Sequence, residues 1–400
     1  MPASEGGIAA RVAEERKLAG LTQQQLAQRS NVSTSLLRKV EQGTVPASPA
    51  FVSATARALG VGVAELLEQP YERTTRSEQR IHATIPPLRR ELAAYTLPPD
   101  DVRPRSLDQL AAAVADASTL RHAVNLDQLG AELPGLLAEL RAATYQHDGH
   151  NREAIYGLLA EAYAAAGQVA WKLGYTDLSS LTTERIEWAA ARSGDELAAA
   201  AADFYRAGEL ISAAEWKGAL RFLDDARHRI SDRVHGDDEP GLAMHGVLHL
   251  KSGLAAARAG DAPTADAHLS EAHDTARWVR PGSDHYRLAF DRDSVNIWSV
   301  GLAVERCDGT EAVKRADGVT FGPTAPRERV GHHWIDLARG YLLHGDRDRS
   351  IATLQRAKAT APQQTRYHPM VHETIRTLAR AQRKSDPIAR LAAWAGVREA

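Results

Sequence analysis

The stretch of residues 21–43 constrains the fold of this chain most, because its spacing is that of two short helices joined by a tight turn. Thr22 carries the side chain of a helix N-cap, and Ser33 can cap a second helix further along. Asn31 lies between the two and tolerates the left-handed conformation that a sharp turn needs. The sequence therefore predicts a helix, a tight turn and a second helix.

The second predicted helix separates apolar from polar side chains. Leu37 and Val40 stand three positions apart and share the face that should point into a core. The opposite face carries small polar and basic side chains from Thr34, Ser35, Arg38 and Lys39. This pattern is typical of a helix-turn-helix motif whose second helix presents these groups to something outside the domain.

Three short patterns occur here in register, namely Leu-Thr-Gln-x-x-Leu-Ala at residues 21–27, Val-Ser at residues 32–33 and Glu-x-Gly at residues 41–43. In these patterns the stretch resembles the Cro/C1-type (phage-repressor-like, XRE) family of DNA-binding domains. The resemblance covers residues 8–68. It implies a five-helix domain, which we place at residues 1–69.

The resemblance also implies which side chains contact double-stranded DNA. Thr34, Ser35 and Lys39 would read base edges with Arg38 close by, while Gln23 would bind phosphate and lean on Thr34. The full implied set is Gln23, Ser33, Thr34, Ser35, Arg38 and Lys39. Short side chains at positions 34 and 35 depart from the long amides of the family and predict weak or water-mediated readout. A solvated helix surface is the alternative for all of them.

An ion pair between Arg16 and Glu41 is implied by the same resemblance, linking the first and third helices of the domain. The alternative is that both side chains are solvated surface charges. One such domain contacts only one half-site on DNA, so we expect a homodimer on a near-palindromic operator.

Length and composition bound the rest of the chain. Its 400 residues exceed one small core, so several domains or a repeat array are expected. Alanine is abundant, aromatic residues make up 6% and no strand-like alternation occurs, which predicts an all-α fold. The net charge of −2 means that any nucleic-acid binding must come from local placement of basic groups.

Features of other functional classes are sparse. A single cysteine, Cys307, excludes a disulfide framework. No signal-peptide pattern opens the chain. No apolar run reaches the roughly 20 residues of a membrane helix. We therefore expect a cytoplasmic protein without a membrane partner. Catalytic motifs are missing too, so we expect no enzyme and no cofactor. His245 and His249 have a zinc-compatible spacing but lack a third ligand, and His332, His333, His368 and His372 carry the same caution.

Residues 70–106 read as a connector, because prolines interrupt a stretch that keeps helical apolar spacing. We expect one helix here, kinked at Pro86 and Pro87. Its arginines could touch phosphate, although a solvated helix face is the more ordinary use.

Residues 107–400 read as a series of helix pairs. The clearest repeat fits the tetratricopeptide template through Trp334, Leu337, Ala338, Tyr341, Gly345, Ser350, Leu354, Ala357 and Pro362. Shifted copies occur at residues 253–272 and 207–226, with looser ones at 170–179 and 301–312. Small residues at fixed positions let the two helices of a pair approach closely, so a superhelical array of tetratricopeptide-like helix pairs is predicted.

The inner face of such an array could hold a small-molecule or peptide effector. Candidate positions are Arg258, Asn296, Trp298, Glu305, Arg306, His332 and Arg339, each of which could equally be an ordinary polar or core residue. The whole arrangement resembles bacterial regulators that join a Cro/C1-type domain to a tetratricopeptide-like sensor and dimerisation domain, including actinobacterial versions. Two alternatives stay open, an array that binds a partner protein and a constitutive DNA-binding protein without a ligand.

Overall fold

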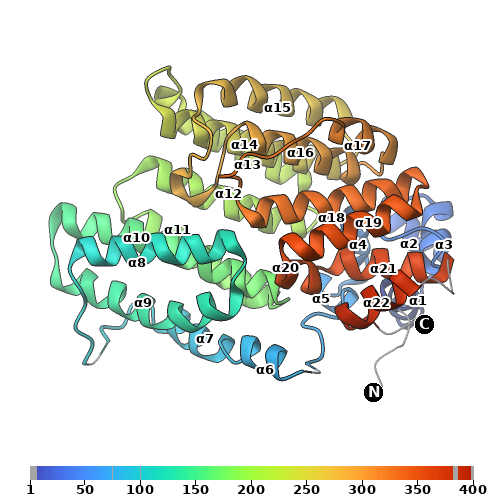
Figure 1. The fold of residues 1–400 in the computed structure, drawn as a ribbon, viewed down its shortest axis with the longest axis horizontal. Helices are drawn as coiled ribbons and strands as arrows, with labels where there is room; N and C mark the ends of the chain where they lie inside the picture. Colours follow the sequence, from blue (N-terminus) through green and yellow to red (C-terminus); the bar gives the residue numbers. More distant parts are fainter. Residues whose placement is uncertain (1–6, 74, 100, 382–385, 398–400) are drawn as a thin grey trace.

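The computed structural model describes residues 7–73, 75–99, 101–381 and 386–397, and within these residues it contains helices and no β-strand (Figure 1). The predicted all-α fold is confirmed. None of the helices in the described ranges is long and apolar enough to cross a membrane.

The N-terminal domain has the five predicted helices. They are α1 (Gly7–Leu18), α2 (Gln23–Arg29), α3 (Thr34–Glu41), α4 (Pro49–Leu59) and α5 (Val63–Leu66). The Thr22 hydroxyl accepts the Gln25 backbone N–H in a capping box at the start of α2. Asn31 has a φ of 53° in the turn, and the Ser33 hydroxyl accepts the Leu36 N–H at 3.1 Å to begin α3. Local capping therefore sets the motif that the sequence predicted.

The segment after this domain differs from the prediction of one kinked helix. It forms two helices, α6 (Arg76–His82) and α7 (Ile85–Ala93), and Pro86 and Pro87 occupy the first turn of α7. Proline is well tolerated at this place because the first N–H groups of a helix have no partner within it. Ile81, Leu88 and Leu92 are buried in one core with α9. These two helices are thus part of the packed helical domain.

Six helix pairs follow along the chain. The pairs are α8 (Leu107–Ala123) with α9 (Leu126–Gln146), α10 (Gly149–Lys172) with α11 (Thr176–Ala190), α12 (Glu196–Ser212) with α13 (Trp216–Arg229), α14 (Glu239–Arg258) with α15 (Ala262–Thr275), α16 (Arg292–Glu305) with α17 (Gly309–Ala316), and α18 (Arg327–His344) with α19 (Arg347–Thr360). Ala256 and Ala265 are fully buried between α14 and α15. Small residues therefore let the paired helices approach, as the repeat pattern predicted.

The first helices of successive pairs pack against one another and form an inner layer. α12 packs on α14, α14 on α16 and α16 on α18, and α18 also packs against α8 at the other end of the series. The array therefore curls until its last full pair meets its first. Short 3-10 helices lie in the connections, η1 (Ser231–Arg233), η2 (Ala276–Trp278) and η3 (His285–Arg287).

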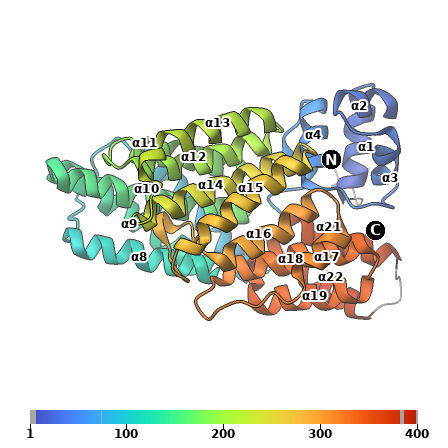
Figure 2. The same cartoon turned by 90° about the horizontal axis from the view of Figure 1, so that it is seen from above.

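Three C-terminal helices complete the molecule, α20 (Pro362–Tyr367), α21 (Pro369–Ala381) and α22 (Asp386–Ala395). α21 packs against α18 of the array and against α1 of the N-terminal domain. Figure 2 shows this neighbourhood, with the blue N-terminal helices beside the red C-terminal ones. The two ends of the chain are therefore held together.

Candidate nucleic-acid interface and inner polar clusters

The outer face of α3 is the candidate nucleic-acid interface. Ser35, Arg38 and Lys39 are exposed, whereas Leu37 and Val40 on the opposite face are buried. Neither basic side chain enters an ion pair with any residue that the structure describes. Both charges are thus free to meet phosphate or a base edge.

The N-terminal end of α3 adds backbone donors to this face. Thr34 is half-buried at the first position, and the exposed Ser33 holds the end of the helix by its capping bond. The first N–H groups of a helix and its dipole favour a nearby anion. The structure therefore gathers Ser33, Thr34, Ser35, Arg38 and Lys39 on one accessible surface.

Arg16 and Glu41 form a two-pronged ion pair inside the domain. Arg16 Nε donates to Glu41 Oε1 at 2.6 Å, and a second guanidinium nitrogen donates to Oε2 at 3.0 Å. The pair leaves 12% of the arginine and 6% of the glutamate side chain exposed, and the hydrogen bond to Glu41 raises the pKa of Arg16. This pair fixes α1 against the end of α3.

Gln23, expected to contact phosphate, also makes a contact inside the domain. Its side-chain amide donates to Glu41 Oε2 at 2.7 Å, and no hydrogen bond joins it to Thr34 among the described residues. The ionised Glu41 carboxylate is a stronger hydrogen-bond acceptor than the Thr34 hydroxyl, which explains why the Gln23 amide donates to Glu41. Gln23 thus supports the Arg16–Glu41 pair at the start of α2.

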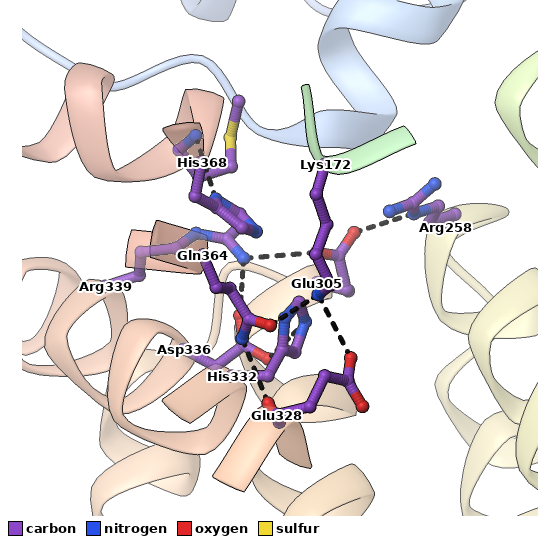
Figure 3. Close-up of polar contacts among 10 residues, drawn as sticks. Lys172, Arg258, Glu305, Glu328, His332, Asp336, Arg339, Gln364 and His368 are labelled. Carbon is purple, nitrogen blue, oxygen red and sulfur yellow. Dashed lines mark hydrogen bonds and ion pairs between the residues drawn. The ribbon is translucent and has the colours of Figure 1, made fainter. Parts of the chain in front are cut away.

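Four of the seven expected effector-binding residues meet in the inner layer of the array. We call this set, together with Asp336, the Glu305 cluster (Figure 3). Arg258 Nε donates to Glu305 Oε2 at 2.8 Å, and Arg339 donates to Glu305 at 3.3 Å and to Asp336 at 2.9 Å. His332 Nε2 lies 3.5 Å from Asp336. Burial opposes ionisation of Glu305, but the two arginines hold its pKa below the ordinary value.

A second set, the Glu328 cluster, was not identified from the sequence. Lys172 Nζ lies 3.2 Å from Glu328 Oε1 and also donates to the Gln364 side chain. Gln364 in turn donates to the Glu328 carbonyl at 3.0 Å, and Arg329 Nε lies 3.4 Å from the Glu328 carboxylate. Figure 3 shows Lys172, Glu328 and Gln364 beside the Glu305 cluster. No sequence pattern signals contacts between residues so far apart along the chain.

The other three expected residues lie outside these clusters. Arg306 donates to Asp266 at 2.8 Å on the side of α15. Trp298 packs against the core between α12 and α14, and Asn296 is half-buried on α16. The structure thus does not bring these three to one surface with the Glu305 cluster.

Three histidines adjoin one another on α14 and α15. His249 Nε2 lies 3.3 Å from His245 Nε2, and His249 Nδ1 lies 2.9 Å from His268 Nδ1. His249 thus contacts His245 and His268 through different ring nitrogens. The described residues contain no group of histidine, cysteine or acidic side chains arranged to hold a metal ion. Burial lowers the pKa of His245 and His268 to about 4 and that of His249 to about 2.

α21 connects the array to the N-terminal domain. The Met370 side chain is 5% exposed and belongs to the core of that domain. Glu373 accepts the Ala47 N–H at 3.3 Å, in the loop that follows α3, and Arg376 donates to Glu68 at 3.3 Å. These contacts hold the N-terminal domain against α21, which itself packs on α18 of the array.

Two further contacts support this docking. The rings of Tyr71 and His372 stack with centroids 4.2 Å apart and planes 11° apart. On the other side, Arg57 of α4 lies 3.0 Å from Glu215 and donates to the Ala214 carbonyl at 3.1 Å. The N-terminal domain therefore rests on the array at two separate places.

Comparisons with known proteins agree with the N-terminal part of this description. Residues 8–69 match a family model described as a helix-turn-helix domain. No curated protein matches the chain. Among solved structures, Bacillus thuringiensis PlcR in complex with the peptide PapR7 and DNA is similar at 18% identity over 67% of this chain and 93% of that chain, with a TM-score of 0.26. Since that score is low, we transfer no residue role from it; what the comparisons show is a helix-turn-helix domain at residues 8–69.

Proposed function

We propose that this protein is a sequence-specific DNA-binding transcriptional regulator whose helical array controls how the helix-turn-helix domain meets DNA. The observation that carries the proposal is the outward face of α3, where Arg38 and Lys39 are exposed and unpaired among the described residues. A basic helix surface without internal partners is what a major-groove reading helix requires.

The side chains divide into readers and supports. Thr34, Ser35 and Lys39 would contact base edges with Arg38 beside them, and either long basic side chain can bond guanine O6 and N7. Ser33 would hold the helix end toward phosphate. Gln23 remains a proposed phosphate contact at the start of α2, while its amide bond to Glu41 keeps the motif at a fixed angle.

Selection of bound sequences from a random DNA library tests the proposal. The intact protein should enrich one motif, and Lys39→Ala should weaken binding to it by about 1–3 kcal/mol while relaxing preference at one base position. Lys217→Ala is the matched control, because Lys217 is an exposed lysine of α13 on the array. Failure to enrich any motif would refute the proposal, and an equal loss on every sequence would reassign Lys39 to phosphate.

A homodimer on a near-palindromic operator is part of the proposal. One domain covers one half-site, and two reading helices must be spaced by roughly 34 Å, one turn of DNA, for both to enter the major groove. The enriched motif should therefore be an inverted repeat, and sedimentation should give two chains per duplex. A single half-site bound by one chain would contradict this part.

Effector sensing is the last part, and the contacts of α20 and α21 support it. Gln364 of α20 belongs to the Glu328 cluster, and Met370 and Glu373 of α21 hold the N-terminal domain. A ligand that binds one position of these helices more tightly would shift the equilibrium between two arrangements of the paired reading helices. The size of that shift is set by the difference in the ligand's affinity for the two arrangements. Adding a small-molecule fraction of a culture extract should change operator affinity, and indifference to every fraction would argue against sensing.

A further inference from the structure

The inner layer of the array contains buried hydrogen-bond donors that find no acceptor among the residues described by the structure. Arg121 is 5% exposed; its Nε donates to Gln168, but its Nη1 atom has no partner among the described residues. The Tyr205 hydroxyl lies close enough to this guanidinium to act on it. Among the described residues, neither that hydroxyl nor Gln168 Nε2 has a partner at good hydrogen-bond geometry. A buried donor without an acceptor costs the fold free energy, so these groups call for an acceptor.

Lys251 of α14 adds an unpaired positive charge to the same layer. Its Nζ atom lies 3.8 Å from the ring centroid of Phe204 on α12. Within the described ranges, no carboxylate lies at ion-pair distance from it, and the charges that act on it are those of Arg329, Arg258 and the acid Glu209. Burial, then Arg329 and Arg258, lower the pKa of Lys251 to about 7.

Arg329 of α18 joins these groups into one basic region. Its charge acts on Lys251 and, together with that of Arg121, on Lys172. Arg329 Nε pairs with the Glu328 carboxylate at 3.4 Å but donates no well-formed hydrogen bond to any described residue. Arg121, Tyr205, Lys251 and Arg329 come from α8, α12, α14 and α18, which are first helices of their pairs. The closure of α18 on α8 is what gathers them.

The acids that face this region already have partners. Glu328 is shared between Lys172 and Arg329, as described above. Asp284 pairs with His122 at 3.1 Å, and Glu209 accepts the Ser180 hydroxyl at 2.6 Å. Donors without partners among the described residues therefore remain at Arg121 and Arg329. They lie in the same layer as Lys251, whose ammonium feels the Glu209 carboxylate without pairing with it.

We propose that the inner layer of the array binds a small oxyanion, the carboxylate or phosphate group of a small molecule, between Lys251, Arg329 and Arg121. The Phe204 and Tyr205 rings lie beside the site and suit an apolar part of the same ligand. The anion would satisfy the unpartnered donors and neutralise Lys251. The role of this anion as an effector rests on the proposed function. Its binding to the array does not depend on that function.

Thermal unfolding of the full chain at constant ionic strength tests the site, with sodium phosphate, sodium acetate and sodium chloride as the three salts. Phosphate stabilises most proteins by exclusion from their surfaces, so the measured quantity is the shift beyond that of the Lys251→Met variant. Phosphate or acetate should raise the unfolding midpoint of the wild type by several degrees more than it raises that of Lys251→Met. A larger shift in phosphate assigns a phosphate group, and a larger one in acetate assigns a carboxylate.

Two further variants separate binding from structure. Lys251→Arg keeps the charge and should keep the anion-specific shift, and Lys217→Met removes an exposed lysine and should behave as wild type. In chloride alone, Lys251→Met should be at least as stable as wild type, because it removes a half-buried charge that has no ion-pair partner among the described residues. Equal salt responses in wild type and Lys251→Met, or a lower midpoint of Lys251→Met in chloride, would overturn the site.

The same proteins then report on regulation. If the anion binds but operator affinity stays constant, the site stands and its role as effector site falls. If no DNA motif is enriched at all, the proposed function falls while the anion result is unaffected.

Discussion

Replacing Met370 by alanine should loosen the N-terminal domain from the array without unfolding either. Met370 belongs to α21, yet its side chain is 5% exposed within the core of the N-terminal domain. Truncating a buried methionine to alanine removes its transfer free energy and leaves a cavity, at a cost of about 2–4 kcal/mol. Because Met370 joins α21 to the N-terminal domain, most of this loss should weaken the contact between them and not the stability of either part.

Hydrogen exchange measures this loss directly. At about 1.4 kcal/mol per tenfold change, opening of the contact should become roughly 30- to 1,000-fold more frequent. Backbone amides at the docking surface, such as that of Ala47, which donates to Glu373, should therefore exchange faster. Met244→Ala is the matched control, since Met244 is 2% exposed in the core of the array. Equal exchange at Ala47 in the two variants would refute the docking role of Met370.

Three other predictions concern single groups. Arg16→Met should destabilise the N-terminal domain by about 3 kcal/mol in urea unfolding, because it strands the nearly buried Glu41 carboxylate, and adding Glu41→Leu should recover part of the loss. In the folded protein the pKa of His249 is about 2, well below its ordinary 6.5. Below pH 6.5 the unfolded chain therefore binds more protons than the folded one, and stability should fall on acidification. His249→Leu should make the fall in melting temperature with acidification shallower. Lys251 has a pKa of about 7, below its ordinary 10.5, so stability should rise between pH 7 and pH 10, and Lys251→Met should flatten this rise in chloride. An unchanged pH profile in either variant would contradict the assigned pKa shift.

The helix-turn-helix domain could be predicted closely because its determinants are local. Thr22 and Ser33 cap their helices through contacts three residues away, and Asn31 adopts the left-handed turn that its side chain tolerates. The helix pairs were predictable for a related reason, since the small residues that separate paired helices recur at fixed spacing. The Ser350 hydroxyl, for example, donates to the Ala338 carbonyl at 2.8 Å within one pair.

The connector shows where local rules misled the prediction. Pro86 and Pro87 inside an apolar helical pattern suggested a kink, but proline equally suits the first turn of a new helix. Burial decides between the two, because Ile81 and Leu88 must both reach the core around α9. Sequence periodicity holds no information about where that core lies.

Closure of the array lies further beyond sequence patterns, and it determines the chemistry of the interior. The repeat template specifies how a helix meets its partner, but it is silent on whether α18 meets α8. That meeting places Lys172 of α10 against Glu328 of α18 and gathers Arg121, Arg329 and Lys251 in one layer. A shift of the closure by one helix pair would leave Lys172 and Glu328 buried without each other, at a cost of several kcal/mol. The Lys172–Glu328 pair, which adjoins the candidate ligand site, therefore also favours this closure over its neighbours.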